Sequence, residues 1–165
     1  MYNTTEYKTV NPQKVSFMYL RNGASMLVQF DSYKERVACG RVQTLYYKRP
    51  FEFRSLDQLL LIIDDVLDSV DFEKDPADLR RLYGEDGAEH LVFQRFNMED
   101  VYTEEDIINR KYENPFKGEL VIRVLGRQNG GMQGEVRIGT GTARFRSSLE
   151  LLRMLYEFLD HRYSK

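Results

Sequence analysis

Apolar and polar residues alternate along two separate stretches of the chain, at about residues 26–53 and 120–145. A period of two is typical of strands that bury one face, so each stretch predicts a pair of half-buried strands. The positions expected to face the core are Met26, Val28, Phe30, Val42 and Phe53 in the first stretch and Leu120, Ile122, Val124, Val136, Ile138 and Phe145 in the second. Asn129-Gly130 supplies the residues favoured in a tight hairpin turn between the later pair.

Each stretch runs into a segment with helical spacing that opens on a serine. Ser55 with Gln58 and Ser147 with Glu150 both match the capping-box pattern S-x-x-E/Q, which satisfies backbone N–H groups at a helix start. Apolar residues then recur at helical spacing: Leu56, Leu59, Leu60, Ile63 and Leu67 in one segment, and Leu149, Leu152, Leu155, Tyr156 and Leu159 in the other. We therefore expect two helices, beginning after Ser55 and Ser147.

Both predicted helices carry further apolar residues outside these stripes. These are Leu61, Ile62 and Val66 in the first and Leu151, Met154 and Phe158 in the second. A helix that covers one sheet needs a single apolar face. The extra residues therefore predict cover from the other helix, from the connecting segment or from a second copy of the chain.

The two stretches resemble each other. When residues 53–68 are placed over 145–160 without a gap, 7 of 16 positions are identical. Upstream, with a two-residue gap, Gly40 falls on Gly134 and residues 26–28 fall on 120–122. Two copies are too few for a solenoid, so we expect a pseudo-symmetric domain.

The predicted fold class is α+β: a duplicated strand-strand-helix unit, with an antiparallel sheet or sheets and the helices packed on one face. The expected boundaries are a polar N-terminal segment (1–14), a first unit (15–70), an acidic connector (71–116) and a second unit (117–165), all in one compact domain. Further strands are expected at 15–20 and 90–96, and short helices after Asp75-Pro76 and Thr103.

Charge is unevenly distributed along the chain. The net charge is +5 over residues 1–56, −11 over 57–116 and +4 over 117–165. Either the acidic connector lies over basic sheet surface, or a basic face is kept for an anionic partner.

No pattern of catalytic or ligand-binding residues stands out. The two histidines, His90 and His161, have no metal-ligand neighbours at a recognised spacing, the glycine-rich stretches lack the lysine of a phosphate loop, and Cys39 is a single cysteine. We expect no cofactor and no metal, and no enzyme. The polar start and the absence of a long apolar run predict a cytoplasmic protein without a membrane partner.

Arginines are the candidate binding residues. Alternation places Arg123, Arg127, Arg137 and Arg144 on the outer face of the second unit, with Arg41, Gln43, Tyr47 and Arg54 on that of the first. Arg54 and Arg146 precede the helix caps, where they could bind an anion or pair with an acidic residue of the first turn. The candidate set for an anion or partner is Arg41, Arg54, Arg123, Arg127, Arg137 and Arg146.

The second unit contains the strings R-Q-N (127–129), Q-G (133–134), F-R-S (145–147) and L-E-L-L (149–152). In these strings it resembles short uncharacterised proteins of anaerobic Gram-positive bacteria, although Met132 stands where that pattern has tryptophan. The resemblance implies a bacterial origin and a small duplicated module. It carries over no functional residues.

Three functions follow as hypotheses. The first is a non-enzymatic binding or adaptor module that recognises a partner protein or forms a homodimer, which the doubly apolar helices favour. The alternative is a nucleic-acid or nucleotide binder that uses the arginine-rich sheet face. The third is an enzyme whose site assembles only in space.

Overall fold

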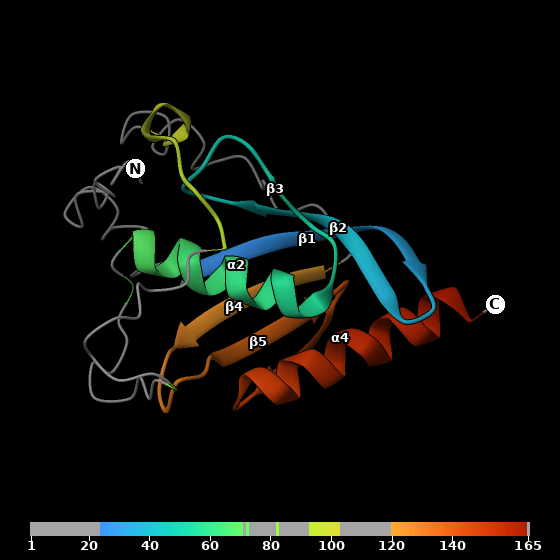
Figure 1. Ribbon diagram of the computed structural model, residues 1–165. Helices are drawn as coiled ribbons and strands as arrows, with labels where there is room; N and C mark the ends of the chain where they lie inside the picture. Colours follow the sequence, from blue (N-terminus) through green and yellow to red (C-terminus); the bar gives the residue numbers. More distant parts are fainter. Residues whose placement is uncertain (1–23, 71, 73–81, 83–92, 103–119, 165) are drawn as a thin grey trace.

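The computed structural model describes residues 24–70, 72, 82, 93–102 and 120–164, which form an α+β fold. One six-stranded antiparallel sheet has the order β3-β2-β1-β4-β5-β6, and two helices cross one of its faces (Figure 1). The strands are β1 Ala24–Lys34, β2 Val37–Thr44, β3 Phe51–Phe53, β4 Leu120–Gly126, β5 Gln133–Ile138 and β6 Gly141–Phe145; the helices are α2 Leu56–Ser69, α4 Ser148–Tyr163 and the single 3₁₀ turn η1 Met98–Asp100.

Each half of the sheet has three strands followed by a helix. The expected units had two strands, but a short third strand (β3 or β6) precedes each helix. The halves meet where β1 pairs with β4 in an antiparallel register that sets Leu27 opposite Val121. On either side of that pair, Met26 lies opposite Ile122 and Val28 lies opposite Leu120. The pairing is therefore symmetric about the Leu27–Val121 pair, and a single sheet contains both halves.

Two glycines occupy matching places in the outer ladders. Gly40 pairs with Phe53, and Gly134 pairs with Phe145. A Cβ on Gly40 would lie 2.1 Å from the Gln29 carbonyl oxygen and 2.8 Å from Cζ of Phe53. No side chain fits at such distances, so glycine allows the phenylalanine ring to lie across the strand.

The helix starts are those predicted. The Ser55 hydroxyl accepts a hydrogen bond from the Gln58 N–H, and the Ser147 hydroxyl accepts one from the Glu150 N–H. In return, the Gln58 side chain accepts from the Arg54 N–H at 2.7 Å. These reciprocal bonds satisfy donors that a helix start leaves unpaired.

The core lies between the sheet and the two helices. Ile62 and Val66, expected to need extra cover, are buried in the chain itself. In α4 the buried stripe is Leu151, Leu155 and Leu159. Leu149 was expected to face inward, but it is 57% exposed. The stripe of α4 is therefore rotated from the predicted one.

Several predictions lie outside the described residues. They are the polar segment 1–14, the strand at 15–20, the short helices after Asp75-Pro76 and Thr103, and residues 90–92 of the strand predicted at 90–96. The described remainder of that strand, residues 93–96, is not a strand.

Candidate functional site

The sheet face opposite α2 and α4, here called the helix-free face because neither of these two helices covers it, carries most of the predicted arginines. Register sets Gln29, Arg41 and Glu52 in one row across the first half. The corresponding row in the second half is Arg123, Glu135 and Arg144. The acidic residue is at the edge in the first row and in the middle in the second. Only the second row has two arginines.

Besides the buried Arg127, three of the predicted arginines have acidic partners near the protein surface. Arg41 lies 3.3 Å from Asp31, and Arg123 lies 3.4 Å from Glu135. Arg146 donates to the Glu150 carboxylate at 2.7 Å, which raises the pKa of Arg146 and lowers that of Glu150, chiefly through the hydrogen bond. Exposed pairs of this kind contribute little to stability.

Arg137 and Arg144 differ from these. Both are exposed, and neither forms an ion pair with any residue that the structure describes. They occupy diagonal positions on β5 and β6, because Arg137 pairs with Thr142 and Arg144 pairs with Glu135. Two arginines at the free edge of the second half are thus available to an outside group. Arg54 is also exposed, and its described bonds are made by its backbone: the N–H donates to Gln58, and the carbonyl accepts from the Cys39 thiol.

The centre of the helix-free face is closed to solvent. Leu27 and Val121, which form the middle pair, are buried together with Ser25. The accessible charge therefore lies toward the edges of the sheet.

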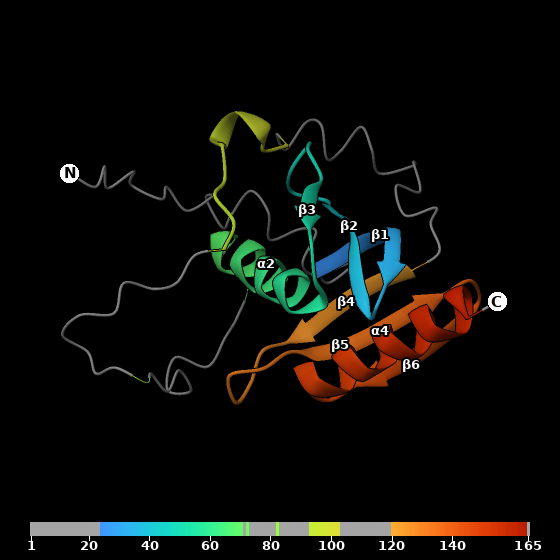
Figure 2. The same cartoon turned by 45° about the vertical axis from the view of Figure 1, so that its right-hand side comes forward.

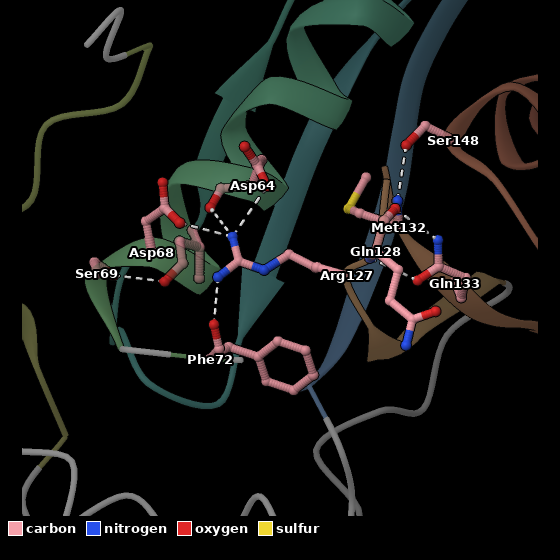
Figure 3. A network of polar contacts seen from close by, with 10 residues as sticks. Asp64, Asp68, Ser69, Phe72, Arg127, Gln128, Met132, Gln133 and Ser148 are labelled. Carbon is pink, nitrogen blue, oxygen red and sulfur yellow. Dashed lines mark hydrogen bonds and ion pairs between the residues drawn. The ribbon is translucent and has the colours of Figure 1, made fainter. Parts of the chain in front are cut away.

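Arg127 is not on the helix-free face, contrary to the prediction. Its side chain is 4% exposed and reaches the end of α2, where it donates to Asp64 at 3.0 Å and Asp68 at 2.7 Å (Figure 3). It also donates to the backbone carbonyl of Phe72, and the guanidinium lies over the Phe72 ring. Its contacts within the chain make Arg127 a structural residue.

A β-bulge accounts for this difference. The β4–β5 register shifts between Val124 and Gly126, so one extra residue enters β4. Beyond a bulge the alternation is reversed, and Arg127 turns to the helix side. The first half has its bulge at the matching place, between Phe30 and Ser32.

The residue matching Arg127 is Tyr33, and it makes the matching contact. Its hydroxyl donates to Asp160 of α4 at 2.6 Å, as Arg127 donates to Asp68 of α2. Loss of hydration and this bond raise the pKa of Tyr33 to about 12. Each half therefore ties the end of its first strand to the helix of the other half.

Tyr47 was also expected on the helix-free face, and it lies in the core. Strand β2 ends at Thr44, whose hydroxyl accepts from the N–H groups of Tyr46 and Tyr47 and so turns the chain inward. The Tyr47 hydroxyl then donates to Ser69 at 2.7 Å. The arginines of this face are therefore not interleaved with Tyr47.

The two halves differ most at the corner where β5 turns into β6. On the helix side Ile138 is 43% exposed and Ala143 is exposed. The residues in matching register in the first half, Thr44 and Phe51, are only 1% and 9% exposed. The second corner, made by Ile138, Gly141 and Ala143, is here called the open corner. In Figure 2 α4 crosses in front of β5 and β6, and its C-terminal end lies by the β1–β2 turn, where Arg36 is 3.8 Å from Asp160.

In the first half residues 96–102 cover the matching corner. The Phe96 ring stacks on Tyr47 at 4.8 Å and meets Phe51 edge-on at 5.5 Å. The Lys48 N–H donates to the Asp100 carbonyl, and the Tyr102 N–H donates to the Tyr46 carbonyl. The open corner could not be predicted from the sequence, because the cover of a strand end depends on where distant segments pack. The only signal was the short β5–β6 turn, since the first half has six residues between β2 and β3.

Across the described ranges no three His, Cys, Asp or Glu side chains are grouped so that they could hold a metal ion. In those same ranges no helix is long and apolar enough to cross a membrane. No family model matches the chain, and no curated protein or solved structure matches it either.

Proposed function

We propose that the protein is a non-enzymatic binding module that takes a partner protein along the edge strand β6. The observation that carries this proposal is the exposure of β6, where every residue except Phe145 is exposed. An edge strand offers a row of backbone donors and acceptors to another chain, and strand addition is a common mode of protein recognition.

The other edge strand is less suitable for this role. β3 has only three residues, and two of them, Phe51 and Phe53, are buried. Its corner already carries the segment 96–102. Partner binding is therefore assigned to the second half.

Burial in the helices favours a partner other than a second copy. The homodimer hypothesis rested on apolar residues outside the main helix stripes, for which a second copy was one of three expected sources of cover. Ile62, Val66 and Leu151 are at most 1% exposed within one chain. These residues consequently need no second copy.

Site-specific photo-crosslinking in the native host tests the proposal. The variant Ala143→p-benzoylphenylalanine places the reactive group on β6, and the matched control Arg41→p-benzoylphenylalanine places it on β2 in the other half. We expect a protein adduct from position 143 that is absent from position 41. Equal labelling from the two positions, or no protein adduct at 143, would show that β6 is not the binding edge.

Anion binding on the helix-free face is the second candidate, favoured by Arg137 and Arg144, which have no described ion-pair partner. Two phosphate contacts predict weak binding with a shallow salt dependence. Retention of DNA, RNA or nucleotides that falls with salt and is lost in Arg137→Ser/Arg144→Ser would support it. Retention unchanged by this double substitution would remove it.

We also infer that the two halves are copies of one unit that originally paired with itself. Matching glycines, bulges and caps support this inference. So do the ties from Tyr33 to Asp160 and from Arg127 to Asp68, since each helix is held by the other half. A single unit would lack this bond to its helix, whereas two paired units would form it once for each helix.

A further inference from the structure

We propose that the partner of β6 is an extended segment in which acidic residues alternate with aromatic ones. The inference rests on the proposed function and adds the chemistry of the partner. It is drawn from the two faces of the β5–β6 edge.

The two faces of this edge differ in character. On the helix-free face it presents Arg144 and, one strand further in, Arg137, neither with an ion pair to a described residue. On the helix side it presents the open corner with Ile138 and Ala143. Residues of an added strand point alternately to the two faces, so one set would lie beside arginine and the other beside apolar surface.

Charge complementarity indicates that the partner residues on the helix-free face, beside the arginines, are Asp or Glu. Opposite charges on neighbouring strands stabilise a sheet, and like charges destabilise it. The first half gives an internal precedent, since its corner segment carries Glu99 and Asp100, and the Asp100 carboxylate lies 3.3 Å from Arg49.

The covered corner of the first half indicates that the partner residues on the helix side of the sheet are aromatic. There the Phe51 ring meets the rings of Tyr47 and Phe96 edge-on, at 5.3 and 5.5 Å. In the open corner the residue in the place of Phe51 is Ala143, which leaves out the whole ring. An aromatic side chain from a partner would supply that ring and cover Ile138.

Fluorescence anisotropy with two labelled peptides tests this inference on the full chain. The probe is Ser-Glu-Phe-Glu-Phe-Glu-Ser, and the control peptide carries lysine at each glutamate position. We expect the acidic peptide to bind at least about tenfold more tightly than the basic one, because a reversed charge at a binding face costs on this order.

Three variants locate the site. Arg144→Glu and Ile138→Asp should each weaken binding of the acidic peptide about tenfold, while Arg41→Glu, on the helix-free face of the other half, should not. Thermal melts confirm that each variant folds. If neither peptide binds, if the basic peptide binds equally well, or if Arg41→Glu weakens binding as much, the proposed chemistry is wrong.

The two proposals fail separately. A crosslinked partner at position 143 together with no peptide binding would keep β6 as the binding edge and overturn the acidic-aromatic partner. A dimer in light scattering that Arg144→Glu and Ile138→Asp dissociate would identify the occupant as a second copy and overturn this inference.

Discussion

Gly134 occupies a position in the sheet where close packing excludes any larger residue. A Cβ there would lie 2.0 Å from the Arg123 carbonyl oxygen and 2.9 Å from Cζ of Phe145, so the strand or the ring would have to move. Gly134→Ala should lower the free energy of unfolding by about 3 kcal/mol or more, measured by urea denaturation. Gly141→Ala is the matched control, because its nearest contact would be an ordinary 3.5 Å. Equal effects of the two substitutions would contradict this account.

Arg127 is the second residue whose substitution should lower the stability clearly. Arg127→Met removes a buried guanidinium and leaves the Asp68 carboxylate and the Phe72 carbonyl without that donor. Breaking a buried pair costs about 3–5 kcal/mol, and the partial exposure of Asp64 and Asp68 reduces this to about 2–3 kcal/mol. Arg137→Met should change the free energy of unfolding by less than about 0.5 kcal/mol. If both variants unfold at the same urea concentration, Arg127 is not a structural residue.

Both helices begin at a serine cap, Ser55 for α2 and Ser147 for α4. Ser147→Ala removes the acceptor of the Glu150 N–H and should lower the free energy of unfolding by about 1 kcal/mol. Ser55→Ala should have a similar effect, because the Gln58 N–H is bonded in the same way. Chemical denaturation measures both, with Ser164→Ala, a substitution of the exposed serine at the C-terminal cap of α4, as a reference. No loss in either variant would show that the caps do not stabilise the helices.

Local chemistry made part of this architecture predictable. The capping boxes located both helix starts, and alternation placed residues such as Val28 and Ile122 in the core. The prediction of strand faces failed past Val124, since a bulge reverses the alternation without a distinctive residue to mark it. Burial of Tyr47 and exposure of Ile138 depend on segments far away in the sequence. Alternation within a strand cannot show what covers its end.

The hydrogen bond from Tyr33 to Asp160, which connects the two halves, predicts a response to alkaline pH. The pKa of Tyr33 is raised from 10.0 to about 12 in the folded chain, so its contribution to stability is complete below pH 10 and is lost as the pH rises toward 12. Tyr33→Phe should lose the hydrogen bond at neutral pH and remove this part of the alkaline decline. Urea denaturation between pH 8 and 11.5 measures both effects, and parallel pH profiles for the two proteins would contradict the assignment.

The reciprocal pairing of the halves predicts that their order in the chain can be exchanged. β1 and β4 occupy matching places at the centre of one sheet. The distance from the end of α4 to the start of β1 should therefore resemble the distance from the end of α2 to the start of β4. A permuted chain would place residues 120–164 first, then a flexible Gly/Ser linker of about 20 residues, which can span a small domain, then residues 24–102. We expect one cooperative thermal transition, with the Tyr33 and Arg127 ties intact. The control is a chain with the natural order of halves and the same linker in place of residues 103–119. If the control folds and the permuted chain does not, the halves are not interchangeable units, and the inference that they are copies of one self-pairing unit is wrong.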